Sequence, residues 1–195
     1  MIKHYSEIHG WCDFDDLYEH YSKILTNDGV FVELGVWMGR SICSLGQRIL
    51  TLGKTPKIFA VDTFKGSDNE TEGHAPMVKE CGGSTLSIFK SNMEDLGISK
   101  LITIIENDSF AASQTFLDNE IDILFIDANH SYEYVINDLN YWYPKVKSGG
   151  ILSGHDYSWD TVKQATKDFS KNKNLKVSAV SNNCWIMQKQ YVGQF

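Results

Sequence analysis

Near the middle of the chain lies the segment IDILFIDA, residues 121–128, in which only Asp122 interrupts the apolar residues before Asp127. A strand with one face in water alternates apolar and polar residues, whereas a strand covered on both faces is apolar almost throughout. The segment therefore predicts a central strand of a parallel sheet that has helices on both sides.

The flanking segments alternate between strand and helix patterns. The apolar runs predict strands at VFVELG (30–35), KIFAVD (57–62), LITIIEND (101–108) and, after a Gly149-Gly150 turn, GILSGHD (150–156). Apolar periodicity predicts helices at 40–52, 84–96, 109–118, 132–146 and 160–170. Two last short strands, 175–180 and 184–189, are close enough to require a hairpin, so one of them must run against the parallel sheet.

These elements predict one α/β domain, a three-layer sandwich spanning residues 1–195. Residues 1–29 form an N-terminal helical extension, in which a helix from an Asp13 N-cap to Leu25 carries Phe14, Tyr18 and Tyr21 on one face. The polar insertion 65–83, with Gly73, Gly82 and Gly83, is expected to be a surface loop or a lid.

Charge and hydropathy exclude several classes of partner. Eighteen Lys+Arg against 25 Asp+Glu give a net charge of −7 and a pI near 5.3. This sign disfavours nucleic acids and anionic membranes. No apolar run reaches the roughly 18 residues of a membrane span, and the start MIKHYSEIHG lacks a signal core, so we expect a cytoplasmic protein. The four cysteines form no C-x-x-C pair, so neither a zinc site nor a disulfide framework is expected.

The first strand runs into the pattern E-x-G-x-x-x-G, formed by Glu33, Gly35 and Gly39. Dinucleotide folds need a middle glycine for the pyrophosphate, and here the bulky Val36 and Trp37 stand in its place, which argues against NAD or FAD. The loop can still approach a compact zwitterion, with Glu33 near its ammonium and backbone amides near its carboxylate. The alternative is that both glycines only ease a tight turn. The candidate cofactor residues here are Glu33, Gly35, Trp37, Gly39 and Ser41.

Polar residues also end the second and third strands. Asp62, followed by Thr63, is placed to accept hydrogen bonds from a ribose diol, which implies an adenosine. Asp108 and Ser109, which follow Asn107, are placed to meet an adenine edge. Helix capping and solvated loop carboxylates are the alternative explanations for these residues.

Together the three strand ends resemble those of class I S-adenosyl-L-methionine (SAM)-dependent methyltransferases. The resemblance covers nearly the whole chain and implies a Rossmann-like, seven-stranded, mostly parallel sheet with a C-terminal antiparallel hairpin. It also implies SAM as the cofactor. The expected activity is methyl transfer.

Two further motifs sharpen the resemblance: D-x-x-H-S-Y-E at 127–133 and G-G-x-x-x-x-H-D-Y at 149–157. They resemble the macrocin O-methyltransferase and cephalosporin-hydroxylase-like branch. That resemblance implies that Asp127 serves the cofactor site and the chemistry, that Asp127 and Asp156 bind Mg²⁺, and that His130 is a catalytic base. His155 stands where the metal-dependent relatives have a carboxylate. Since imidazole suits Mn²⁺ or a similar ion better than Mg²⁺, we count His155 as a candidate ligand.

The chemistry of a sulfonium methyl donor agrees with these roles. The neutral thioether is a good leaving group, so the main tasks of the enzyme are to align the reacting atoms and to remove the proton of the acceptor hydroxyl. A cation lowers the pKa of a hydroxyl, and a histidine can accept its proton. The structural alternatives are a capping or packing role for His130 and a turn carboxylate for Asp156. Of the aromatic residues near the strand ends, we expect Trp37 near the cofactor and Trp159 near the acceptor.

The sequence predicts an O-methyltransferase acting on a hydroxyl of a sugar, a glycan or a small metabolite. A nicotinamide-dependent oxidoreductase is the first rival, disfavoured by the missing middle glycine. A noncatalytic SAM-binding module is the second, disfavoured by the intact D-x-x-H and H-D-Y motifs. We also expect a homodimer, because the aromatic face of the N-terminal helix suits either the site or a neighbouring subunit.

Overall fold

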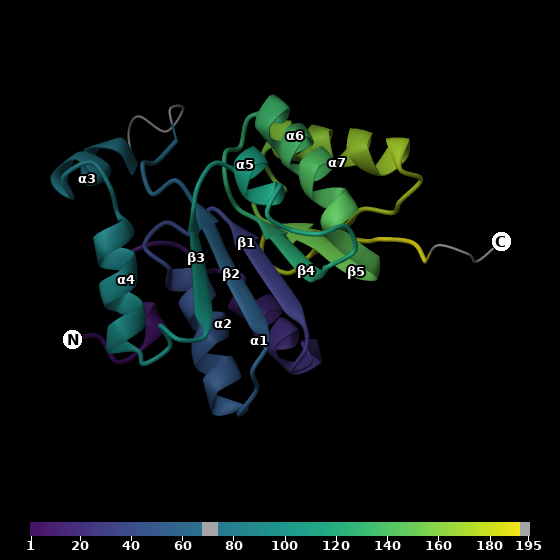
Figure 1. Cartoon of the computed structure of the whole chain (residues 1–195). Helices are drawn as coiled ribbons and strands as arrows, with labels where there is room; N and C mark the ends of the chain where they lie inside the picture. Colours follow the sequence, from purple (N-terminus) through teal and green to yellow (C-terminus); the bar gives the residue numbers. More distant parts are fainter. Residues whose placement is uncertain (68–73, 192–195) are drawn as a thin grey trace.

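The computed structural model describes residues 1–67 and 74–191, and it contains one seven-stranded sheet in the order β3-β2-β1-β4-β5-β7-β6 (Figure 1). Strands β1 to β5 pair in parallel, while β7 runs antiparallel to β5 and β6 antiparallel to β7. The predicted α/β fold and its terminal hairpin are therefore confirmed.

The strands are β1 (Val30–Leu34), β2 (Lys57–Asp62), β3 (Ile102–Glu106), β4 (Ile121–Ile126), β5 (Val146–Gly154), β6 (Ser178–Val180) and β7 (Cys184–Gln188). The helices are α1 (Asp15–Ile24), α2 (Arg40–Thr51), α3 (His74–Glu80), α4 (Leu86–Asp95), α5 (Ser109–Ser113), α6 (Tyr132–Trp142) and α7 (Asp160–Asn172). Two short 3₁₀ turns are η1 (Tyr5–Glu7) and η2 (Tyr143–Lys145).

Apolar residues cover both faces of the sheet. Phe31 of β1 joins a core cluster with residues of α1, α2 and α4, while Val32 and Leu34 join a second cluster with residues of α5, α6 and α7. All five residues of β1 are buried. Successive side chains of a strand point to opposite faces, so an apolar strand supports one core on each side.

The aromatic face of α1 belongs to the first core. Phe14, Tyr18 and Tyr21 are fully buried, and their rings contact Phe31 and Phe125 of the sheet at centroid distances of 4.8–6.2 Å. These side chains therefore pack within their own chain and leave no aromatic face for a neighbouring subunit. The homodimer stays a prediction, which light scattering would test.

Several predicted boundaries were wrong. Gly149 and Gly150 lie inside β5, which begins at Val146, the last residue of the predicted helix. The register between β4 and β5 shifts at this point, and Gly149 has a φ of +79° that suits a bulge. Helix α5 also ends earlier than predicted, at Ser113.

The insertion 65–83 is only in part a loop, because it contains α3 (His74–Glu80). Residues 68–73, which include Gly73, lie outside the described residues. The N-cap of α1 is Phe14 and not Asp13, and no side chain caps this helix. Asp13 has other partners, described below.

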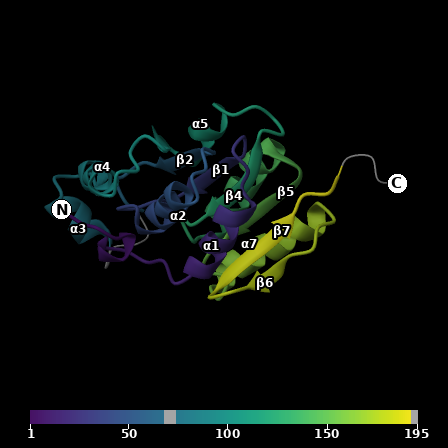
Figure 2. The same cartoon turned by 90° about the horizontal axis from the view of Figure 1, so that it is seen from below.

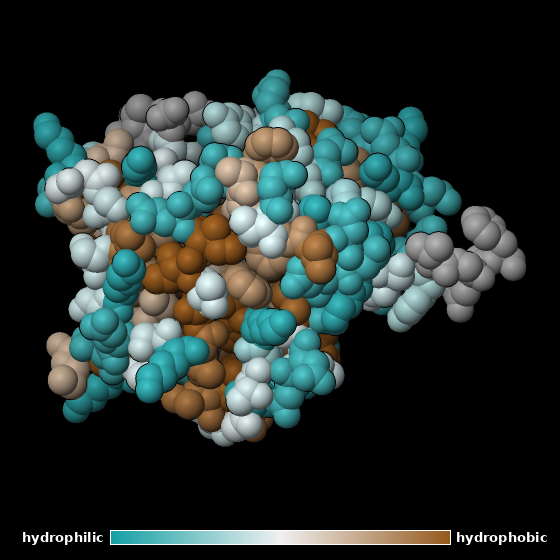
Figure 3. Space-filling view, in the orientation of Figure 1, coloured by the Kyte–Doolittle hydropathy of each residue, from teal (hydrophilic) through white to brown (hydrophobic). Residues whose placement is uncertain are grey.

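Because α5 is short, the sheet is less covered near β2 and β3, where Figure 3 shows apolar side chains gathered at the surface. Phe59 and Ile105 are only partly buried on this face, and Leu117 is 76% exposed. Among the described residues, no helix is both long and apolar enough to cross a membrane.

Candidate active site

The carboxyl ends of β1, β2, β4 and β5 meet at one edge of the sheet, where ligands bind in open α/β sheets. Backbone hydrogen bonds hold these ends together: Gly35 N donates to Val61 O, Asp127 N to Leu34 O and His155 N to Ile126 O. The candidate residues that follow these strands therefore share one edge.

Asp62 organises the loop after β1. Its Oδ2 accepts hydrogen bonds from the backbone N–H groups of Val36 (2.8 Å) and Trp37 (2.9 Å), and its Oδ1 accepts one from Phe64 N (2.7 Å). Burial raises the pKa of Asp62, and these N–H donors oppose the rise. The backbone N–H of Thr63 adds to these donors, so a further ligand would have to share the carboxylate with them.

Packing inside the protein explains both glycines of this loop. Gly35 has a φ of +81°, and a Cβ there would lie 2.1 Å from the carbonyl oxygen of Asp127. Gly39 has a φ of +93°, and its Cβ would meet the ring of Phe89 at 2.8 Å. The loop after β1 is therefore in direct contact with the backbone at the end of β4.

Glu33 lies beneath the loop and is fully buried. Its Oε1 accepts a hydrogen bond from the Ser41 hydroxyl, while Oε2 is buried, with the Tyr18 side chain near the carboxyl group, and forms no well-aligned hydrogen bond with the residues that the structure describes. Burial raises the pKa of Glu33 to about 8, although Ser41 lowers it. Glu33 is therefore protonated near neutral pH unless a cation arrives beside it.

The other candidate cofactor residues have partners within the protein. The Thr63 hydroxyl accepts a hydrogen bond from Lys65 N, and Asp108 caps α5 by accepting one from Ala111 N. Ser109 Oγ accepts a hydrogen bond from Trp142 Nε1 at 2.8 Å, which turns this hydroxyl toward α6.

Asp127, His130 and Asp156 form a compact cluster after β4 and β5. Ligand atoms from all three lie within 4.8 Å of one another, and His130 Nε2 is 2.8 Å from Asp156 Oδ2. Asp156 has a φ of +56°, a strained backbone for a residue other than glycine and one that recurs at functional sites. The structure thus brings together the residues of the two sequence motifs.

His155 joins this cluster from its other side. Its Nδ1 lies 3.3 Å from Asp156 Oδ2 and 3.8 Å from Asp127 Oδ1. Burial lowers the pKa of His155, but the neighbouring carboxylates raise it more, so the net shift is upward. Imidazole therefore carries positive charge among these acids more readily than it would in water.

The two carboxyl groups respond in opposite ways. Burial raises the pKa of Asp127 to about 6, and His155 and His130 only partly offset the rise. Burial also raises the pKa of Asp156, but contacts with His130 and His155 hold it well below its usual range. Asp156 is therefore the permanent anion, and Asp127 is the group nearer to proton exchange at neutral pH.

Sequence analysis missed Asp13, whose Oδ1 lies 3.0 Å from Nε2 of His155. No spacing rule could have paired these two residues, because the N-terminal segment reaches the site only in the folded chain. The same holds for Asn183, whose side chain donates to Asp156 Oδ1 at 3.3 Å.

Two exposed or partly exposed tryptophans flank the site. The ring of Trp159 is half exposed and lies 4.8 Å from the ring of His130, whereas the ring of Trp37 lies 4.3 Å from that of His74. An open groove of about 590 Å³ runs along α7 next to the first residue of α6; it is lined by Tyr132, Asp160, Thr161, Lys163, Gln164 and Lys167.

Comparison with known proteins agrees with this geometry. Residues 32–157, which span both the loop after β1 and the cluster after β5, match the model of a family described as a methyltransferase domain. The chain belongs to this methyltransferase family. An uncharacterised protein of Acanthamoeba polyphaga mimivirus is 30% identical over 132 residues, which are 67% of this chain and 52% of that protein. The chain thus spans about half the length of this curated relative.

Solved methyltransferases share the whole fold. The O-methyltransferase NovP superposes with a TM-score of 0.69 at 18% identity, covering 91% of this chain and 80% of NovP. An O-methyltransferase from Bacillus cereus in complex with SAH, S-adenosylhomocysteine, gives 0.65 at 14% identity, covering 92% and 82%. These likenesses show that the chain has the fold of these methyltransferases, and the family match makes it a methyltransferase domain.

Proposed function

We propose that this methyltransferase moves the methyl group of SAM to a hydroxyl oxygen of a sugar, a glycan or a small metabolite. The observation that carries the proposal is the cluster of Asp127, His130 and Asp156, which lies at the same sheet edge as the loop that begins at Gly35. A methyl donor in that loop and an acceptor at the cluster would be neighbours. This is the arrangement that direct transfer requires.

The residues of the loop fit SAM. Glu33 Oε2 is a buried acceptor that forms no well-aligned hydrogen bond with the described residues, and it suits the ammonium of the amino-acid part. In this proposal the ribose shares the Asp62 carboxylate with the backbone N–H donors described above. The N–H groups of Val36 and Trp37 already donate to Asp62, so in this proposal they shape the loop and do not bind the cofactor carboxylate.

The residues of the cluster fit a divalent metal. Two ligands of one ion with bonds of about 2.1 Å lie on the order of 3–4 Å apart, which agrees with ligand atoms of Asp127 and Asp156 that lie within 4.8 Å of each other. His155 Nδ1 is an additional candidate ligand at 3.3 Å from Asp156. A set of carboxylates and imidazoles suits Mn²⁺ or Fe²⁺ as well as Mg²⁺.

A bound ion would supply Lewis acidity that lowers the pKa of the acceptor hydroxyl. Protein side chains would orient the acceptor hydroxyl and remove its proton. Asp156, as the permanent anion, fixes the His130 ring at 2.8 Å. In this proposal His130 accepts the hydroxyl proton as attack proceeds, and Asp127, whose pKa is raised to about 6, orients the hydroxyl.

Trp159 and the groove along α7 support a hydroxylated acceptor. The half-exposed indole beside His130 offers a flat apolar face to a sugar ring or a small aliphatic group. Lys163 and Lys167 offer charged donors in the groove, whereas the Thr161 hydroxyl already donates to His130 O and the Gln164 amide to Asp168.

A methyl-transfer screen tests the proposal. Purified protein, trideuteromethyl-SAM and pools of sugars, glycans and hydroxylated metabolites would be analysed by mass spectrometry, with and without EDTA. We expect label on a hydroxyl oxygen, loss of turnover in EDTA and recovery with Mn²⁺ or Mg²⁺. Full turnover in EDTA would remove the metal and leave His130 as the sole activator. Label on nitrogen or carbon would contradict the proposed acceptor class.

Cofactor binding separates the rival functions. Calorimetric titration should show tight binding of SAH and none of NAD or NADP. Binding of NAD without SAH would support the oxidoreductase instead. Binding of SAH with no transfer to any acceptor, in the presence of metal, would favour a noncatalytic module.

A further inference from the structure

The N-terminal segment reaches the proposed methyl-transfer site. Figure 2 shows this segment passing beside the turn between β6 and β7, and the Asn182 side chain donates a hydrogen bond to the carbonyl oxygen of Asp13. The next residue, Phe14, is fully buried, and its ring lies 4.8 Å from the rings of both Phe125 and His155. The backbone at Asp13 is therefore fixed from both sides.

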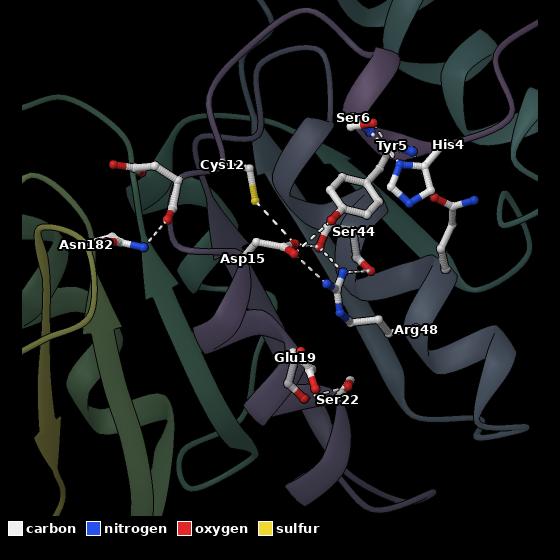
Figure 4. Close-up of polar contacts among 12 residues, drawn as sticks. His4, Tyr5, Ser6, Cys12, Asp15, Glu19, Ser22, Ser44, Arg48 and Asn182 are labelled. Carbon is white, nitrogen blue, oxygen red and sulfur yellow. Dashed lines mark hydrogen bonds and ion pairs between the residues drawn. The ribbon is translucent and has the colours of Figure 1, made fainter.

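A polar network farther along anchors the same segment (Figure 4). Asp15 accepts hydrogen bonds from Tyr5 Oη (2.8 Å), Ser44 Oγ (2.6 Å) and Arg48 Nη2 (2.5 Å), which joins η1, α1 and α2. Asp16 accepts a hydrogen bond from the Ser181 hydroxyl. The place of Asp13 thus does not depend on its own carboxylate, which is 61% exposed.

The Asp13 carboxylate forms an ion pair with the ring of His155. Its Oδ1 lies 3.0 Å from Nε2, while the opposite ring nitrogen, Nδ1, lies 3.3 Å from Asp156 Oδ2. A carboxylate next to one imidazole nitrogen fixes the ring orientation and thereby aims the other nitrogen. Because the Asp13 side chain of this pair is 61% exposed, water screens the attraction and the pair contributes little to stability, so its consequence lies in orientation.

We propose that Asp13 is a positioning residue that holds the His155 ring and, through it, the carboxylate of Asp156. The Asp156 backbone is in the left-handed region, and its carboxylate is held through Oδ2 by the rings of His130 and His155 and through Oδ1 by a longer 3.3 Å bond from Asn183. The N-terminal segment is then part of the site and not only a cover for the sheet. This inference rests on the proposed function, since it assigns Asp156 to that site.

Three variants test the inference: Asp13→Ala, Asp13→Asn and Asp16→Ala. Asp16→Ala is the matched control, because Asp16 ties the same segment to the β6–β7 turn but does not contact His155. Each variant is examined for unfolding, SAH affinity, Mn²⁺ affinity by electron paramagnetic resonance and, once an acceptor is known, kcat and KM. Crystal structures of wild type and Asp13→Ala give the His155 ring orientation directly.

We expect Asp13→Ala to lower Mn²⁺ affinity or kcat about 10- to 100-fold, the usual effect of losing a carboxylate behind a site histidine, with SAH affinity unchanged. Asp13→Asn, which keeps an acceptor oxygen, should recover part of the loss. Asp16→Ala should bind Mn²⁺ and turn over as wild type does. In the Asp13→Ala crystal, the His155 ring should rotate away from Asp156.

An unchanged His155 ring in that crystal would overturn the inference, as would equal losses in Asp13→Ala and Asp16→Ala, which would indicate docking of the segment alone. Failure of the proposed function would give a different set of results from failure of this inference. Wild type would then bind no Mn²⁺ and transfer no methyl group, while the two crystal structures would still decide whether Asp13 positions His155.

Discussion

Asp62 has an observed role in shaping the loop after β1 and a proposed role in binding the cofactor, and one set of variants tests both. In Asp62→Ala, the N–H groups of Val36, Trp37 and Phe64 lose their acceptor. Each hydrogen bond to a charged group contributes about 1.5–3 kcal/mol, but water and loop relaxation will recover part of the sum. We expect the free energy of unfolding to fall by about 3 kcal/mol or more.

SAH affinity should fall as well, by about tenfold or more, because the charge-assisted bond to the ribose is lost along with the loop shape. Asp62→Asn separates the two effects. Its single oxygen can still accept from Val36 and Trp37, so the loss of stability should be smaller, while the charge opposite the ribose is gone. Asp118→Ala, an exposed partner of Lys145, is the surface control.

Urea unfolding and calorimetric titration with SAH measure both quantities. An Asp62→Ala protein with unchanged stability and unchanged SAH affinity would refute the reasoning outright. A loss of stability with unchanged SAH affinity in both variants would leave Asp62 as a loop residue and remove it from the cofactor site.

Three further predictions concern the same sheet edge. The pKa of Glu33 is about 8 in the folded protein against an ordinary 4.5, so the native state binds this proton more tightly and stability is lost as pH rises from about 4.5 to 8. Glu33→Gln should therefore be more stable than wild type at pH 9 and equally stable at pH 4. Thermal unfolding measured across this pH range tests the prediction. Gly35→Ala should lower the free energy of unfolding by about 3 kcal/mol or more, because a Cβ 2.1 Å from Asp127 O forces the strand ends apart. Chemical denaturation measures this change, and a variant as stable as wild type would contradict the close approach. Asp156→Asn and His130→Ala should lose turnover while calorimetry shows wild-type SAH affinity; a matching loss of SAH binding would instead place these residues in the cofactor site.

The sequence was most informative where local patterns set the structure. The apolar run at 121–128 predicted a central strand because burial on both faces needs apolar residues at every position, and β4 lies in the middle of the sheet order. The motifs that contain Asp127 and Asp156 predicted neighbours because parallel strands end at one edge. Their ligand atoms do lie together.

Tertiary contacts decided what the sequence could not. Gly149 and Gly150 read as a turn, yet they form a bulge inside β5 because Gly149 N donates to Lys189 O of the neighbouring segment. Asp13 read as a helix cap, yet its carboxylate faces His155. In both cases the local signal was consistent with two structures, and a contact with a residue far along the chain selected one of them.

The most direct test of the account compares wild type with Asp127→Asn in transfer of a trideuteromethyl group from SAM to a hydroxylated acceptor. Both proteins should bind SAH with similar affinity, which shows that the cofactor loop is intact. The account predicts that wild type labels a hydroxyl oxygen and that Asp127→Asn labels none above background. Undiminished transfer by Asp127→Asn would contradict the claim that the chemistry takes place at this cluster.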